Sequence, residues 1–187
     1  MRGVKRLGML VGSIWLILQA VNVYADDMRP VKLKARGSGY HQVPSVSSQG
    51  RARFKARINA TRTEVAYKLS YEGAEGNVFM AHIHFGQHFA NGGISVWFCG
   101  DPASPIFPPP VTISVPLCEP KAGTLEGVFT ADDLLGPGGQ GIAPGEFEEF
   151  LQALKRGVTY INIHSDKHIP GEIRGQIRPS KRSRSHD

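Results

Sequence analysis

Apolar and polar residues alternate along much of this chain in short runs, which is the period-two pattern of β-strands with one buried face. The first three runs cover residues 31–35, 54–58 and 65–71. Their apolar positions alternate largely with charged residues, such as Lys55 between Phe54 and Ala56. We therefore predict three strands of a sheet whose other face contacts solvent.

Five further runs are also predicted to be strands. The run at 78–85 is apolar on both sides up to its histidines, with Phe79, Ala81, Ile83 and Phe85 on the face opposite to them. Another follows the turn Asn91-Gly92-Gly93. The five ranges are 78–85, 94–99, 125–129, 158–164 and 172–177.

One amphipathic helix interrupts the strands. Phe147, Phe150, Leu151 and Leu154 have the spacing i, i+3, i+4 and i+7, and the pattern ends near Gly157. Thr130 is placed to cap one short helical turn. The proline-rich segment 101–110 and the glycine-rich segment 136–145 read as loops. Together these elements predict an all-β fold, an antiparallel Greek-key β-sandwich or barrel with one inserted short helix.

The first 25 residues have the pattern of a cleavable signal peptide. Basic residues at positions 2, 5 and 6 precede an apolar run to about Val23, and Val-Tyr-Ala ends at Ala25. We predict cleavage near Ala25 and a secreted or periplasmic protein, with an uncleaved anchor as the alternative. The run is too short and too polar to favour a membrane span, and the mature chain has no other candidate.

The formal net charge of +6 does not predict a nucleic-acid-binding protein. Residues 26–177 contain 15 basic and 15 acidic residues, and the excess lies in the predicted signal peptide and at the basic end of the chain. We therefore predict one folded domain over residues 26–178, a disordered basic tail over 179–187, and no nucleic-acid partner.

Two cysteines, Cys99 and Cys118, flank the proline-rich loop. An even pair in an oxidising compartment usually forms a disulfide, which is our prediction here. Metal ligation by the two thiolates is the alternative, although zinc sites typically pair their cysteines at closer spacing.

Five of the seven histidines fall in two short windows of the sequence. His82 and His84 share one face of a predicted strand, and His164 ends another. His88 and His168 each follow one of these histidines by four residues. Imidazoles grouped on strands can chelate copper, zinc, nickel or iron. A histidine network without metal, satisfied by its own hydrogen bonds, would give the same pattern.

The last predicted strand places Glu172, Arg174 and Gln176 in a row on one face. Such a row suits groups that support a nearby site, and a solvated face with a salt bridge explains it equally well. The sequence contains no Ser-His-Asp arrangement and no Gly-x-Ser-x-Gly elbow, which argues against hydrolase chemistry.

Three segments together resemble the CHRD domain, a module first described in chordin and also found singly in exported bacterial proteins. They are AHIHFG (81–86), NGG (91–93) and YINIHSDKHIPGEIRGQI (160–177). The resemblance covers residues 30 to 178 and implies an all-β domain without a defined activity.

A weaker resemblance links the His-x-His strand and the late histidine strand to copper/zinc superoxide dismutases, which have a Greek-key β-sandwich. That resemblance implies that His82, His84 and His164 match copper ligands and that Arg174 stands near the metal. The bridging histidine and the zinc loop of that family have no counterpart, and neither His88 nor His168 matches by spacing.

The sequence thus predicts an exported CHRD-domain protein that binds copper, with zinc as the alternative metal, without catalysis. The ligands would be His82, His84 and His164, with His88 or His168 as extra ligands and Glu172 and Arg174 behind them. The alternatives are an extracytoplasmic domain that binds a protein partner without metal, and a redox enzyme resembling a dismutase.

Overall fold

The structure is a computed structural model that describes residues 29–100 and 115–180. The predicted signal peptide and its cleavage site, the proline-rich loop 101–110 and residues 181–187 of the predicted tail lie outside the described residues. The chain divides into the units Met1–Pro30 and Val31–Asp187. Only Arg29 and Pro30 of the first unit are described, and everything below concerns the second.

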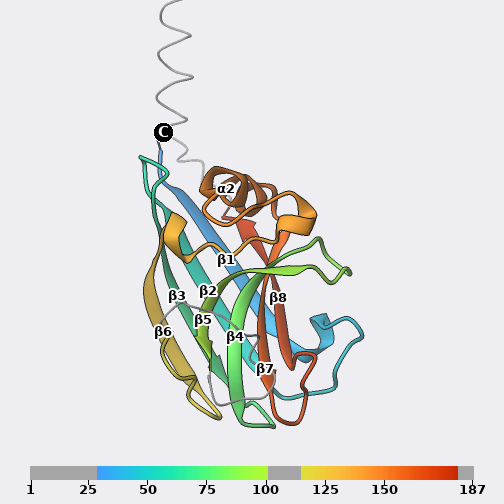
Figure 1. Ribbon diagram of the computed structural model, residues 1–187. Helices are drawn as coiled ribbons and strands as arrows, with labels where there is room; N and C mark the ends of the chain where they lie inside the picture. Colours follow the sequence, from blue (N-terminus) through green and yellow to red (C-terminus); the bar gives the residue numbers. More distant parts are fainter. Residues whose placement is uncertain (1–28, 101–114, 181–187) are drawn as a thin grey trace, which may run out of the picture. The chain divides into compact units, whose positions relative to one another are not determined.

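Eight antiparallel strands form one sheet in the order β5-β4-β7-β8-β1-β2-β3-β6 (Figure 1). Each predicted strand is present, with bounds that differ by a few residues at most ends. The strands are β1 (Val31–Ser38), β2 (Arg51–Ile58), β3 (Val65–Glu72), β4 (Val78–Phe85), β5 (Gly93–Gly100), β6 (Gly123–Phe129), β7 (Thr159–Ser165) and β8 (Ile173–Pro179).

The sheet curls into a nearly closed barrel. Strands β5 and β6 stand at the two ends of the hydrogen-bonded order and contact each other. The chain crosses over between β3 and β4 and again between β6 and β7, so that β7 pairs with β4. The spatial order β7-β4-β5-β6 is a Greek key. The predicted fold class is therefore confirmed.

The period-two pattern separates the inside of the barrel from the outside. Leu33, Phe54, Leu69 and Ile161 point inward and are at most 2% exposed. Burial of each such side chain stabilises the fold by about 1.5–3 kcal/mol. On β4, an irregularity in the pairing with β7 lies between Val78 and Met80. As a result Val78 belongs to the core and Phe79 does not, which corrects the prediction that Phe79 shares a face with Ala81 and Ile83.

The predicted helix is α2 (Phe147–Arg156), which lies at one end of the barrel (Figure 1). Its apolar stripe is buried, with Phe150, Leu151 and Leu154 fully covered. The helix ends because Gly157 adopts a left-handed conformation, with φ of 71°, and donates its N–H to the last carbonyls. The described residues also form three short 3-10 turns: η1 (Gly39–His41), η2 (Ala131–Asp133) and η3 (Gly138–Gln140). None of the described helices is long and apolar enough to cross a membrane.

The predicted disulfide between Cys99 and Cys118 is present. It joins the end of β5 to the segment before β6, 19 residues further along the chain. A cross-link across a loop of that length stabilises a domain by roughly 3 kcal/mol, mainly because it restricts the unfolded chain.

Reduction of this disulfide is expected to lower the free energy of unfolding by about 3 kcal/mol. Urea denaturation with and without reductant measures the difference, and the Cys99→Ala/Cys118→Ala variant serves as the control that reductant leaves unchanged. A reduced chain with the same urea midpoint as the oxidised chain would contradict the prediction.

Candidate metal centre

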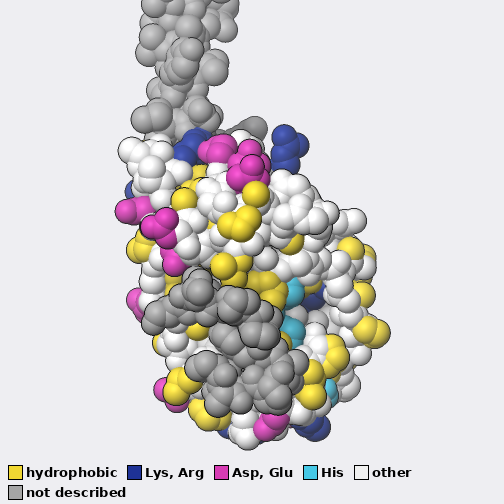
Figure 2. Space-filling model, in the orientation of Figure 1, with side chains coloured by type: hydrophobic (Ala, Val, Ile, Leu, Met, Phe, Trp, Pro, Cys, Tyr) yellow, Lys and Arg dark blue, Asp and Glu magenta, His cyan; other side chains and the backbone are white. Residues whose placement is uncertain are grey.

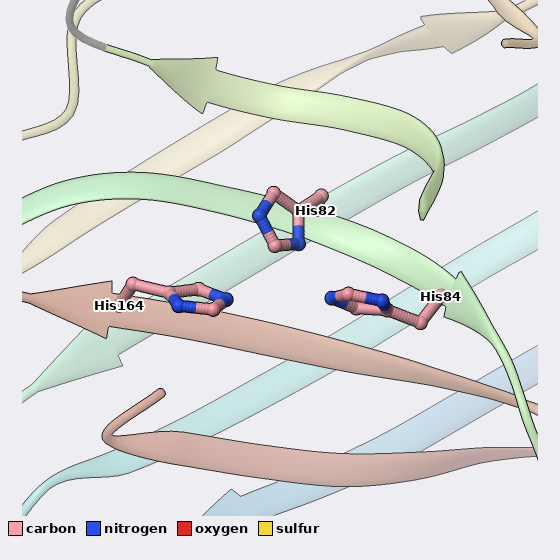
Figure 3. A group of neighbouring side chains, drawn as sticks. All are labelled: His82, His84 and His164. Atoms are coloured by element: carbon pink, nitrogen blue, oxygen red, sulfur yellow. The ribbon is translucent and has the colours of Figure 1, made fainter. Parts of the chain in front are cut away.

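His82, His84 and His164 come together on the outer face of the barrel, from the neighbouring strands β4 and β7 (Figure 3). Because Ala81 and Ile83 point into the core, the alternating histidines of β4 must point outward. The antiparallel register places His164 of β7 opposite Met80, beside His82. The three predicted strand histidines are therefore one cluster.

Two irregularities in the pairing of β4 with β5 flank these histidines. One lies between Ala81 and His82 and the other between Ile83 and His84. Bulges of this kind turn side chains and often occur next to functional sites. Here they bring Trp97 opposite His82, and the two rings meet edge to face at 4.7 Å between centroids.

The three imidazole rings surround a common point. The ring of His82 lies 4.6 Å from each of the other two, and His84 and His164 are 6.4 Å apart, all between centroids. In Figure 3 the rings of His84 and His164 point toward each other from opposite sides, with His82 above the gap between them. One nitrogen of each ring lies within 4.8 Å of the others.

This spacing is wider than one bound ion requires. Three nitrogens bonded to the same ion at about 2 Å lie within about 4 Å of one another. The described positions therefore need a closing movement of about 1 Å. The three rings already face the same space.

Backbone carbonyls fix the tautomers of two rings. The Nδ1 atom of His84 lies 2.8 Å from the carbonyl oxygen of Gly92, and Nδ1 of His164 lies 2.7 Å from that of Ile169. A carbonyl oxygen only accepts hydrogen bonds, so each Nδ1 carries the proton. Each Nε2 is then left with a lone pair, which is the form in which histidine binds a metal.

Three of the four remaining ring nitrogens have no hydrogen-bond partner among the described residues. They are Nε2 of His84 and both nitrogens of His82, and all three are buried. The fourth, Nε2 of His164, lies 2.9 Å from Nδ2 of Asn162 and accepts its hydrogen bond. Buried polar atoms are rarely left unpaired, and a bound ion is one explanation for such a group.

The cluster is uncharged at neutral pH. Burial lowers the pKa of His84 to about 4, with a smaller contribution from the charge of His164. Burial also lowers the pKa of His164 to about 4. For His82, burial together with the charges of His164 and His84 puts the pKa well below its usual range. A metal ion would therefore not compete with protons for these nitrogens at pH 7.

Gly92 allows the close approach that orients His84. A Cβ atom at this position would lie 1.7 Å from the carbonyl oxygen of Phe85. Only glycine fits here, and its own carbonyl then accepts from His84. The predicted Asn91-Gly92-Gly93 turn is thus part of the site.

Tyr160 separates the cluster from a buried cation. Its ring stacks on His84 at 4.7 Å between centroids, and the Arg174 guanidinium lies 3.5 Å from the Tyr160 ring centroid. Since β7 lies between β4 and β8, Tyr160 stands between these two side chains. The nearby positive charge adds to the depression of the pKa of His84.

Glu172, Arg174 and Gln176 form the predicted row, but the row is not a solvated face. Glu172 and Arg174 are at most 1% exposed. They do not pair with each other: the guanidinium donates to the side chain of Asn91 and to the carbonyl oxygens of Gln87 and Ala90.

The other two members of the row also hold loops. Glu172 accepts from the Ser48 hydroxyl at 2.6 Å and from the Glu75 backbone N–H at 2.7 Å. Burial alone would raise the pKa of Glu172, but the hydrogen bonds it accepts outweigh that effect and lower it. Gln176 donates to the carbonyl oxygens of Gly86 and Gly157. The row therefore anchors loops around the histidine cluster, although Oε1 of Gln176 is buried without a hydrogen-bond partner among the described residues.

Neither His88 nor His168 belongs to the cluster that the described residues form. The ring of His88 packs against Phe89 in an exposed loop. Nε2 of His168 lies 3.7 Å from a carboxylate oxygen of Glu75. Both were predicted as extra ligands because each follows a strand histidine by four residues. These positions lie in loops, where the side chain need not point to the same side as the histidines of the preceding strand.

Three residues around the site had no role in the sequence prediction. They are Trp97, Tyr160 and Asn162, which contact His82, His84 and His164 respectively. Tyr160 and Asn162 share a face with His164 at two-residue spacing, so the alternation itself could have identified them. On the face drawn in Figure 2, histidine side chains reach the surface only as small areas.

Comparison with known proteins identifies one family. A family model described as the CHRD domain matches residues 33–177. No curated protein and no solved structure matches the chain. The similarity to copper/zinc superoxide dismutases remains a prediction from the sequence.

Proposed function

The chain belongs to the CHRD domain family, and from that premise we propose that it is an exported domain that binds one copper ion without catalysing a reaction. The ligands are Nε2 of His84, Nε2 of His164 and one ring nitrogen of His82. The observation that carries the proposal is the convergence of three buried, neutral imidazoles whose lone pairs are largely unpaired.

The donor set favours copper over other common ions. Imidazole nitrogen suits copper, zinc, nickel and iron, and copper(II) has the highest affinity of the divalent series for a given nitrogen site. No carboxylate of the described residues joins the cluster, which disfavours magnesium, calcium and manganese. Zinc is the alternative that the experiment must separate from copper.

Binding without turnover is proposed because the groups around the site serve to hold structure. Arg174 is covered by the 87–91 loop and Tyr160, so it is not placed to guide an anion to the site. The buried Glu172 carboxylate is occupied by Ser48 and by backbone N–H groups. Neither has the free polar atom that a catalytic acid, base or anion guide would present.

Export supports the proposal through the chemistry of the compartment. The disulfide between Cys99 and Cys118 is stable outside the reducing cytosol. The amino-terminal pattern that ends at Ala25 indicates the same route. An oxidising location also makes copper(II) accessible to the site.

The test is metal uptake by the purified chain. Equilibrium dialysis against copper, followed by elemental analysis, is expected to give one copper ion per chain, and His84→Ala is expected to bind none. His88→Ala is the matched control, because His88 lies outside the cluster, and it should bind one ion. Parallel dialysis against zinc measures the preference between the two metals.

Unchanged uptake in His84→Ala would contradict the assignment of the ligands. No uptake by the unaltered chain, with the same melting temperature with and without chelator, would instead support an extracytoplasmic interaction domain without metal. Preferential zinc uptake would keep the site and change the ion.

A further inference from the structure

The outer faces of β1, β2 and β3 carry a concentration of positive charge. We call this surface the basic face; it consists of Lys32, Lys34, Arg36, Arg51, Arg53, Lys55, Arg57 and Lys68. All eight side chains are exposed, and they are eight of the fifteen basic residues between 26 and 177. The same strands carry one acidic residue, Glu72. Basic and acidic residues are therefore equal in number over this part of the chain, but the basic ones are concentrated on one face.

The strand register sets cations directly opposite one another. Across β1 and β2, Lys32 pairs with Arg57, Lys34 with Lys55, and Arg36 with Arg53. Across β2 and β3, Lys55 also faces Lys68. Like charges directly opposite on neighbouring strands destabilise a sheet. The fold itself gains nothing from this arrangement.

Most of these cations have no acidic partner among the residues that the structure describes. Within the described parts of the chain, Lys68 forms an ion pair with Glu126 on β6. Arg51 donates to the carbonyl oxygens of residues 48–50. The three opposed pairs between β1 and β2 form no ion pair with any described residue. In the view of Figure 2, acidic side chains lie at the end of the barrel where α2 lies, along the left edge and at the bottom.

Two grooves cross this face at right angles to the strands. One, of about 660 Å³, is bordered by Arg36, Arg51 and Arg53 and by the single acidic residue of these strands, Glu72, and it continues over β3 to β6. The other, of about 410 Å³, is bordered by cations that include Lys34, Lys55 and Lys68. Both grooves thus run across neighbouring strands, whose backbones are about 4.8 Å apart, so cations from successive strands follow one another along each groove.

We propose that the basic face binds a linear acidic polysaccharide, a chain with a carboxylate or sulfate group at regular intervals. Such a chain lies along the grooves, and its anionic groups meet the cations of successive strands. Several exposed charge contacts, each weak alone, add up along a polymer. The surface lies on strands other than those of the histidine cluster and does not depend on metal binding.

Other polyanions fit the face less well. A surface that docks on a membrane usually inserts large apolar side chains, and of the exposed ones described only Val128 borders this face. Proteins that bind single-stranded nucleic acids stack the bases on exposed aromatic rings, and the described basic face has none. A groove also matches a polymer chain better than a flat bilayer.

The test replaces three cations of the basic face by glutamine, in the variant Lys34→Gln/Arg53→Gln/Lys55→Gln. The matched control, Lys121→Gln/Lys155→Gln/Arg156→Gln, loses the same formal charge elsewhere. The probes are polygalacturonate and heparin, and vesicles of phosphatidylglycerol distinguish a membrane surface. Isothermal calorimetry or biolayer interferometry at low and at physiological ionic strength measures the affinity.

The unaltered chain is expected to bind at least one polysaccharide, more weakly as salt increases. The basic-face variant is expected to bind about tenfold more weakly or worse, because three weak contacts are lost. Its melting temperature should not fall, since like charges are relieved. Equal loss in the control variant, no binding by the unaltered chain, or binding to vesicles alone would overturn the proposal.

Discussion

Replacement of His82 by leucine is expected to weaken copper binding by more than about a hundredfold, while the apo chain stays at least as stable as before. Both ring nitrogens of His82 are buried and have no hydrogen-bond partner among the described residues. Leucine has a similar volume and removes these unpaired polar atoms, so the change in the free energy of unfolding should be close to zero or favourable. The imidazole of His82 therefore makes no hydrogen bond to a described residue that the leucine variant would lose.

Loss of one of three ligands should weaken copper binding by more than about a hundredfold, since even groups that only support a ligand change affinity by 10- to 100-fold. Copper titration followed by fluorescence or calorimetry measures the affinity, and urea denaturation of the apo protein measures stability. His88→Leu is the control and should change neither. A large loss of stability in His82→Leu would instead assign His82 to a structural network.

Acid is expected to destabilise the metal-free chain strongly between about pH 6.5 and pH 4. The folded chain holds His84 and His164 at a pKa of about 4, whereas an unfolded histidine titrates near 6.5. The unfolded state therefore binds more protons in this range, and stability falls as pH decreases. The stability that the two neutral histidines contribute is fully present above about pH 6.5. It is lost as the pH falls toward their folded pKa values of about 4.

The size of this effect is large for a small domain. A pKa difference of about 2.5 corresponds to about 3 kcal/mol for each of these two histidines. Total stabilities are typically about 5–15 kcal/mol, so acid would remove much of the margin. Bound copper excludes protons from the same nitrogens and should shift the acid transition to lower pH.

Urea denaturation at pH 7 and at pH 4.5, with and without copper, measures the prediction. His88→Gln should retain the full pH dependence, whereas His84→Gln should lose part of it. A metal-free chain with the same free energy of unfolding at both pH values would show that the buried histidines do not control acid stability.

The local pattern of the sequence was sufficient to predict the eight strands and the helix. Alternation tells which residues share a face, and Phe147 to Leu154 show a helical stripe, because both patterns depend only on neighbours in the chain. The face of Phe79 was predicted wrongly because strict alternation was assumed along the whole of β4. An irregularity in the pairing with β7 shifts its direction, and nothing within β4 indicates it.

The candidate site was predicted in part. That His82 and His84 share a face follows from their spacing on one strand. Their approach to His164, about eighty residues later, follows from the pairing of β4 with β7. The loops that bury the cluster, and the unpaired state of its nitrogens, depend on contacts such as those of Arg174 and Glu172.

By itself, the sequence determined which residues alternate, where the strands lie and which side chains could bind a metal. Only the tertiary structure decided the make-up of the two surfaces for which we propose functions. It brought three histidines to one point, and it placed cations from three strands on one face although the charges of the chain balance. Both depend on the register between strands, which is set by packing of the whole barrel and is not encoded by the residues of one strand alone.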